Sequence, residues 1–357
     1  MKAAETIKIG KITLKNRITM APTVKFDYTD GSGLATEKHV EHYRKRAEGG
    51  MGLICVEATA VLPGGRFGEN HMGLWDDAQI EGHKAIVEAC HKAGSAVIIQ
   101  LNHVGCSANP QCGPAIGPST VTLKGWQGDY TVHGMTFDEL HEMQEAFVAA
   151  AVRAQKAGYD GVQLHGCHGY LINQFISVNH NFREDEYGGA PANRARFCSE
   201  IIREIRSACG GDFLISVRTT GMDPTVEDAI LVAEEYVKVG CDYLQVSTGM
   251  TSLDELPRYE DDMIDATRSL GVRFKAHFKD SIPVSCVGGI KDAEMVNHIL
   301  EGGLTDTVDI GRAALADPQF ANHVLRGEPV QKCYGCKMCQ YGPFAKNECP
   351  QSGEQRR

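Results

Sequence analysis

Eight short apolar runs alternate with eight amphipathic segments along this chain of 357 residues. Repeated strand–helix alternation with mostly short links is typical of a closed parallel barrel, because each helix returns the chain for another parallel strand. We therefore predict an α/β protein, a (β/α)8 TIM barrel within residues 1–328. The predicted strands are 18–21, 52–57, 96–101, 161–165, 213–218, 242–247, 283–287 and 307–311. The predicted helices are 35–48, 77–93, 138–157, 193–208, 225–239, 259–276, 291–301 and 313–326.

Two segments depart from this alternation. Residues 7–18 alternate apolar and polar positions around Gly10 and Lys11, which predicts an N-terminal β-hairpin. Residues 102–135 are rich in Gly, Pro and Ser, and connections of that length in compact domains are usually functional. This connection leaves the carboxyl end of the third strand, so we expect it to cover the barrel mouth. Trp126 and Tyr130 could line a substrate pocket there or pack on the surface.

Charge and hydropathy limit the partners of the chain. The formal net charge of −10 argues against nucleic acid or an anionic membrane as a partner. There is no run of 18 apolar residues, so we expect no membrane span. The first 17 residues lack the apolar core of a signal peptide, and we therefore expect a cytoplasmic protein that acts on a small molecule.

The 13 cysteines are distributed unevenly. Nine are scattered through the barrel region, where a reduced thiol packs as a small apolar side chain. The other four form the pattern C-x2-C-x2-C-x9-C in a second, short unit, the tail at 329–357. Thiolates this close together in a reducing compartment indicate a metal site, and a structural zinc ion is one interpretation. The ligands would be Cys333, Cys336, Cys339 and Cys349.

Residues 161–189 contain the candidate catalytic side chains of this sequence. A short apolar run predicts a buried strand, and His165 stands at its carboxyl end. His168 and Tyr170 follow within six residues, at the end of the strand where a barrel places its ligands. A tight loop of hydrogen-bonded polar residues is the alternative, but three protic side chains at one strand end favour a catalytic site.

This stretch resembles the old yellow enzyme family of flavin oxidoreductases. The resemblance rests on H-G-x-H-G-Y-L-x-x-Q-F at 165–175, N-x-R-x-D-E-Y-G-G at 181–189 and N-R-x-R-F at 193–197. It implies a bound FMN and hydride transfer from the reduced flavin to an activated C=C bond, in an α,β-unsaturated carbonyl or thioester.

The resemblance also implies roles for the three protic side chains. In such a reduction, negative charge develops on the carbonyl oxygen of the substrate, and donors aimed at that oxygen act as an oxyanion hole. His165 and His168 are the candidates for these donors. Tyr170 resembles the proton donor to the α-carbon and would act as a general acid.

An FMN site needs a phosphate cradle, partners for the pyrimidine edge and an apolar wall. Barrels commonly hold phosphate with backbone N–H groups after strands seven and eight, here at Gly288, Gly289, Gly311 and Arg312. The resemblance implies four further contacts: a turn beneath the flavin, a neighbour of the ring, a partner of the pyrimidine and a cation beside N1. In that order they are Ala21, Pro22 and Thr23, then Ala58, then Gln100, then Arg218.

Two positions depart from the family pattern. Val24 stands where many members carry a Thr or Cys that hydrogen-bonds the flavin carbonyl, and valine cannot make that bond. Cys106 stands where an Arg often follows the glycine, so a contact near the flavin or a subunit edge is missing.

The cysteine-rich tail resembles one branch of the family, which includes the 2,4-dienoyl-CoA reductases and trimethylamine dehydrogenase. That branch implies a [4Fe–4S] cluster held by the four tail thiolates and relaying electrons to or from the flavin. Its members usually continue into a second half that binds FAD and a nicotinamide, whereas this chain stops eight residues after Cys349. We therefore expect either a separate FAD/NAD(P)H electron-transfer partner or direct reduction by NAD(P)H, and a homo-oligomer.

Two other functions compete with this ene-reductase hypothesis. One is oxidative N-demethylation of a methylated amine, which asks for an aromatic bowl around a cation. With only Trp75 and Trp126 as tryptophans and a histidine at position 165, that function is less favoured. The other is a non-catalytic electron-transfer subunit, which the retained trio of protic side chains disfavours.

Overall fold

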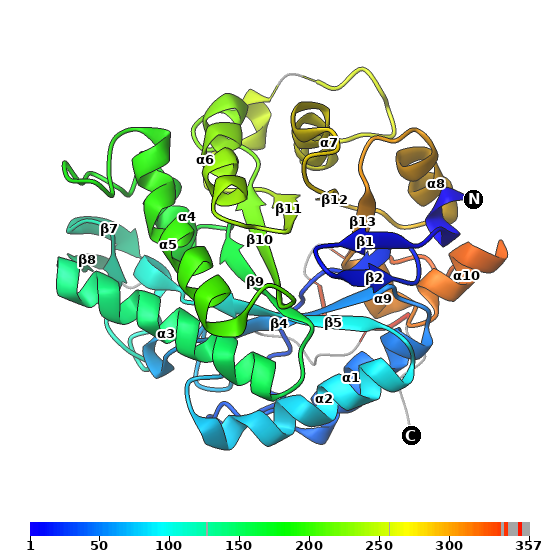
Figure 1. The fold of residues 1–357 in the computed structure, drawn as a ribbon, viewed down its shortest axis with the longest axis horizontal. Coiled ribbons are helices and arrows are strands. Elements are labelled where there is room, and N and C mark those ends of the chain that lie inside the picture. Colours follow the sequence, from blue (N-terminus) through cyan, green and yellow to red (C-terminus); the bar gives the residue numbers. More distant parts are fainter. Residues whose placement is uncertain (126–127, 257, 337–338, 342–348, 352–357) are drawn as a thin grey trace.

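The computed structural model describes residues 1–125, 128–256, 258–336, 339–341 and 349–351. Eight parallel strands close into a barrel in the order β3-β4-β5-β9-β10-β11-β12-β13, with β13 paired to β3 (Figure 1). The predicted TIM barrel is confirmed, and each strand stands where an apolar run predicted it. The strands are β3 Ile18–Met20, β4 Leu53–Ala60, β5 Ala96–Asn102, β9 Gly161–Gly166, β10 Leu214–Thr220, β11 Tyr243–Ser247, β12 Val284–Val287 and β13 Thr307–Ile310.

A hairpin covers the amino end of the barrel, as predicted. Its strands, β1 Ile7–Ile9 and β2 Ile12–Leu14, pair antiparallel. Ile9 and Leu14 pack in one buried cluster with residues at the starts of barrel strands, including Leu53 and Leu214. The hairpin thus closes one end with apolar side chains, and the carboxyl ends of the strands form the open mouth opposite.

Helices surround the barrel and cover the outer faces of its strands (Figure 1). Helix α7 begins at Ala266, later than predicted, where the side chain of Asp265 caps the first turn by accepting from the Arg268 N–H. The predicted helix 313–326 is two helices, because Pro318 lacks the N–H that would continue the first. The helices are α1 Glu37–Glu48, α2 Ile80–Lys92, α3 Phe137–Lys156, α4 Leu171–Ile176, α5 Pro191–Cys209, α6 Val226–Lys238, α7 Ala266–Phe278, α8 Ala293–Glu301, α9 Arg312–Ala316 and α10 Phe320–Arg326. Short 3-10 helices occupy Lys2–Ala4, Pro63–Gly65, Asp77–Gln79, Gly105–Ser107 and Leu253–Glu255.

The long connection after β5 contains a small sheet that the sequence did not predict. Its strands are β6 Ile116–Gly117, β7 Val121–Gly125 and β8 Gly128–Gly134, in the order β6-β8-β7. Tyr130, on β8, donates its hydroxyl to the Cys106 carbonyl at 3.1 Å, which ties the sheet to the turn after β5. Trp126 lies outside the described residues. Within the described chain, no helix has the length and apolar character to span a bilayer.

Candidate active site

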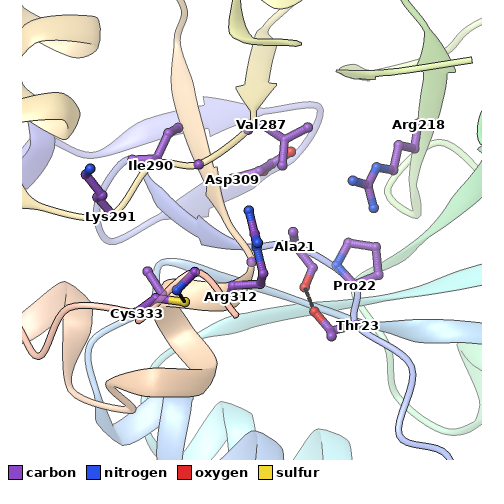
Figure 2. Close-up of a pocket in the computed structure, with 15 residues that line it drawn as sticks. Ala21, Pro22, Thr23, Arg218, Val287, Ile290, Lys291, Asp309, Arg312 and Cys333 are labelled. Atoms are coloured by element: carbon purple, nitrogen blue, oxygen red, sulfur yellow. Dashed lines mark hydrogen bonds between the residues drawn. The ribbon is translucent and has the colours of Figure 1, made fainter. Parts of the chain in front are cut away.

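A cavity of about 430 Å³ lies at the carboxyl ends of the barrel strands, within the range of ~300–1,000 Å³ common for ligand sites (Figure 2). Its walls come from β10 and from the turns after β3, β12 and β13. Eight of the ten residues predicted to bind the cofactor line it. They are Ala21, Pro22, Thr23, Arg218, Gly288, Gly289, Gly311 and Arg312.

The turn after β12 requires glycine at two consecutive positions. Gly288 and Gly289 have φ values of 129° and 59°, which side-chain-bearing residues rarely adopt. A Cβ at Gly288 would also lie 2.9 Å from the Cβ of Thr267. Arg268 of α7 donates to the Gly288 carbonyl and, at 3.0 Å, to the Met263 carbonyl. The backbone of this turn is therefore braced from outside the barrel.

Two guanidinium groups extend into the cavity (Figure 2). Arg312 opens α9 directly after Gly311, and its side chain is exposed. Arg218 comes from the middle of β10 and is 8% exposed. One wall of this cavity is apolar, formed in part by Val287 and Ile290. The cavity thus combines cationic groups with an apolar surface.

A hydroxyl links this cavity to the predicted catalytic trio. Ser247, the last residue of β11, accepts from Arg218 Nη2 at 3.4 Å, and its Oγ lies 2.9 Å from His168 Nε2. His165, His168 and Tyr170 are not among the residues that line the cavity. The structure brings them together beyond Arg218, on the catalytic loop of residues 165–170.

The two histidines contact each other directly. His165 Nε2 lies 3.0 Å from His168 Nδ1, and His168 adopts a left-handed backbone with φ 61°. Burial, and then the charge of Arg218, lower the pKa of His168 to about 3. Burial and the neighbouring His168 and Arg218 lower the pKa of His165 well below its ordinary value. Both imidazoles are therefore neutral at physiological pH and can donate only one proton each.

Tyr170 packs against this pair at the start of α4. Its ring centroid lies 4.9 Å from that of His165 and 4.9 Å from that of Phe67. Burial, and then the neighbouring Cys167, raise the pKa of Tyr170 to about 12. The phenol therefore keeps its proton at neutral pH.

Two predicted cofactor residues lie outside the lining of the cavity. Ala58 is buried, and its carbonyl contacts His71 Nε2 at 2.6 Å. Gln100 is buried in β5 and donates from Nε2 to Gln163 Oε1 at 2.6 Å. Their contacts with a cofactor stay predictions.

The cavity also has lining residues that sequence reasoning missed. Asp309, in the middle of β13, is 2% exposed, and Lys291 follows the glycine turn. An acidic residue between the apolar Val308 and Ile310 of a predicted strand was the available signal for Asp309, because a buried carboxylate needs a specific role or partner.

The cysteine-rich tail reaches the same cavity. Cys333 and Gly335 line it, and the Gly335 N–H donates to Cys333 Sγ at 3.4 Å (Figure 2). Tyr341 is buried, with the Lys25 ammonium 4.3 Å from its ring centroid and the His42 ring at 6.2 Å. The described part of the tail therefore lies against the barrel, and the Gln331 N–H also donates to Asp317 at 2.9 Å.

Among the described residues, no three tail thiols lie within 4.8 Å of one another. Within the described residues, the only three potential metal-ligating atoms that all lie within 4.8 Å of one another belong to His165, Cys167 and His168. Arg218 is close enough to that group to lower the pKa of both histidines, and its charge opposes a cation there.

Comparison with known proteins identifies the family of this chain. Residues 5–331 match the model of the NADH:flavin oxidoreductase / NADH oxidase family. The chain belongs to that family. It is 35% identical over 328 residues to an NADPH dehydrogenase of Clostridium acetobutylicum, covering 90% of this chain and 93% of the relative.

Solved structures agree with this assignment. The old yellow enzyme homologue of Zymomonas mobilis superposes with a TM-score of 0.79 at 26% identity, covering 94% of this chain and 95% of that one. A 2-naphthoyl-CoA reductase gives a TM-score of 0.85 at 24% identity over 96% of this chain but only 57% of its own, a likeness of fold alone. The chain is therefore an FMN-dependent oxidoreductase of old yellow enzyme type that uses a nicotinamide nucleotide.

The residues of the cavity fit FMN. The glycine turns let the backbone approach a ligand closely, and Arg312 adds a positive charge. Both features suit a phosphate group. Val287 and Ile290 offer an apolar surface to a planar ring system, and the buried Arg218 would supply a cation for an anionic reduced flavin.

Proposed function

We propose that this protein is an FMN-dependent ene-reductase that reduces an activated C=C bond, in an α,β-unsaturated carbonyl or thioester. The observation that carries the proposal is the pair of neutral, mutually bonded imidazoles, His165 and His168, beside a protonated Tyr170. This set offers two donors for one oxygen and a separate acid for one carbon, as conjugate reduction requires.

The histidines would bind the carbonyl oxygen of the substrate. Bound reduced FMN supplies the hydride for the β-carbon. As that carbon is reduced, charge moves to the oxygen, where one N–H from His165 and one from His168 can stabilise it. Each such donor contributes ~3 kcal/mol at comparable sites. Because burial keeps both rings neutral, each donates through one nitrogen only, and the present His165–His168 bond must open to the substrate.

Tyr170 would deliver the proton that completes the reduction. Its pKa of about 12 keeps the phenol protonated, and its contact with the His165 ring places it beside the oxygen-binding pair. We assign it as the general acid for the α-carbon. The cofactor contacts proposed for this chain are those of the ten residues predicted above, with Arg218 beside the flavin N1.

We further propose that the tail holds a [4Fe–4S] cluster through Cys333, Cys336, Cys339 and Cys349. Its support is the spacing of the thiols and the position of Cys333 at the flavin cavity. A structural zinc ion with four cysteine ligands is the competing interpretation of the same spacing, and metal analysis separates the two.

The cluster would exchange single electrons with FMN, with reducing equivalents arriving from NAD(P)H directly or through a separate FAD-containing partner. Assembly into a homo-oligomer stays a prediction. Oxidation of a methylated amine is the competing function, and the guanidinium of Arg218 beside the histidines opposes a cationic substrate there.

The decisive experiment is anaerobic purification followed by flavin, iron, zinc and sulfide analysis, then a substrate panel. The photoreduced protein should be reoxidised by an enone or enoyl thioester, and the oxidised protein should not be bleached by a methylamine. Bleaching by the amine alone would replace the proposal with demethylation. Reoxidation by neither compound would favour the electron-transfer subunit, and zinc in place of iron would remove the cluster.

A further inference from the structure

Four buried polar side chains form a continuous chain of hydrogen bonds across the interior of the barrel. Gln100 Nε2 donates to Gln163 Oε1 at 2.6 Å, and Gln163 Nε2 donates to Gln245 Oε1. Gln245 Nε2 then donates to both oxygens of Asp309, at 2.9 Å each. The four come from β5, β9, β11 and β13, and none is more than 2% exposed.

The Asp309 carboxylate fixes the donor-to-acceptor direction of this chain of hydrogen bonds. An ionised carboxylate only accepts hydrogen bonds, whereas an amide can turn to offer either its oxygen or its nitrogen. The hydroxyls of Thr19 and, at 2.8 Å, Ser285 also donate to Asp309, which therefore accepts hydrogen bonds from these two side chains as well as from Gln245. Gln245 must then present its nitrogen to Asp309 and its oxygen to Gln163, and the same constraint passes along to Gln100.

We infer that Asp309 is a positioning residue that acts on bound FMN through Gln245, Gln163 and Gln100. With its nitrogen committed to Gln163, Gln100 keeps its oxygen for the one N–H donor on the pyrimidine edge of a flavin, N3–H. This inference rests on the proposed contact between Gln100 and FMN. The chain links that contact to a carboxylate three side chains away.

The chain makes Gln100 a stronger acceptor than an isolated amide. Hydrogen bonds in a chain polarise one another in a low-dielectric interior, so donation toward Asp309 adds electron density to the Gln100 oxygen. A stronger acceptor at N3–H disfavours further electron density on the ring and lowers the reduction potential of the flavin. Asp309 also lines the cavity with Arg218, so its charge opposes the anionic reduced flavin directly. Both effects lower the reduction potential of the flavin.

Burial raises the pKa of Asp309. The hydrogen bonds from Thr19 and Ser285, and the charge of Arg218, act in the opposite direction. Removing these donors would therefore weaken the charge that orders the chain. The variants are therefore chosen to separate the effect of the hydrogen-bond chain from the effect of the Asp309 charge.

The test compares two variants and a control, each reconstituted with FMN. Asp309→Asn removes the charge and the fixed direction, and Gln163→Leu breaks the chain while the charge stays. Gln163→Met replaces the leucine variant if that one does not fold. Tyr236→Phe is the control, because it removes a buried hydroxyl on α6, outside the barrel strands, and no link of the chain.

The readouts are the midpoint potential, the nitrogen-15 resonance of N3 in labelled FMN, and the dissociation constant of oxidised FMN. We expect the potential to rise in both variants, more for Asp309→Asn, with a shifted N3 resonance in both. The loss of one net hydrogen bond corresponds to an FMN affinity weaker by about three- to tenfold. The control should match the wild type.

Each other result overturns the inference. If only Asp309→Asn moves the potential and N3 is unchanged, the charge acts directly and the chain does nothing. If only Gln163→Leu has an effect, Asp309 does not order the chain. If wild-type protein binds no FMN, the proposed function fails instead, which keeps the two failures distinguishable.

Discussion

The cysteine-rich tail reaches the cavity that fits FMN, and the catalytic loop lies beyond Arg218 in its wall, but the protein holds the two in different ways. His165 is 4% exposed at the end of a barrel strand, and its imidazole is bonded to His168. The tail thiols are partly exposed, and Tyr334 beside Cys333 is 67% exposed. The loop is therefore ordered by the barrel itself, whereas the described tail is joined to the barrel by contacts of exposed tail residues, such as Gln331 with Asp317 and Lys332 with Asp292, and by the buried Tyr341.

This contrast separates two kinds of site. Donors on rigid strands are oriented before the substrate arrives, so they lose little entropy when it binds. Ligands in a segment with few buried contacts gain much of their order from the group they bind, because that binding free energy also pays for folding. The loop should thus tolerate loss of the cluster, and the tail should not.

The largest expected effect follows from removing the oxygen-binding pair. With His165→Ala and His168→Ala combined, turnover of an enone should fall by about 10⁴-fold or more, because each donor contributes 10²–10³. FMN content and absorbance should stay, since neither side chain lines the cavity. Steady-state kinetics and flavin analysis provide the measurement, with the exposed His141→Ala as control. Turnover retained in the double variant would remove the oxyanion role.

The second effect tests the tail. Cys333→Ser should lose most of the iron, because a hydroxyl is a poor ligand for this cluster, while FMN and thermal unfolding of the barrel remain close to wild type. Iron analysis and electron paramagnetic resonance of the reduced protein measure the cluster. Cys112→Ser, at a partly exposed cysteine outside the tail, is the matched control. Full iron content in Cys333→Ser would exclude that residue as a ligand.

The contrast between the buried barrel and the more exposed segments explains which features the sequence could predict. The barrel strands were predictable because helices cover them and their residues are nearly all apolar, as in Leu53–Ala60. Gly288, Gly289 and Arg312 follow from topology, since strand ends meet at one mouth. The sheet of β6, β7 and β8 was missed because its exposed residues show no apolar run. The chain from Gln100 to Asp309 was missed because it depends on side-chain directions that spacing does not encode.

The third effect is a pH dependence of the barrel. The pKa of His168 is about 3 in the folded protein against an ordinary value of 6.5, so below pH 6.5 the unfolded chain gains a proton that the folded chain excludes. The unfolding free energy should therefore fall with pH between 6.5 and about 3, by ~1.4 kcal/mol per pH unit for each such histidine. His83 and His103, each with a pKa lowered to about 4 by burial, add to this slope. Denaturant unfolding at pH 7.0 and 5.5 measures it, and His168→Gln should flatten it. Equal stability at the two pH values would contradict the buried, neutral state.

The smallest effect should come from the contact of Tyr341 with Lys25. The Tyr341 ring holds the Lys25 ammonium at 4.3 Å, and such cation–π pairs contribute ~0.5–2 kcal/mol. Tyr341→Leu should keep the barrel's unfolding temperature but release iron to a chelator several times faster, because the tail then leaves the barrel more often. Tyr334→Leu is the matched control, since it alters an exposed tyrosine of the same tail. Equal release rates in both variants would mean that Tyr341 does not hold the tail. The other contacts of the tail, such as Cys333 at the cavity and Lys332 with Asp292, would then hold it.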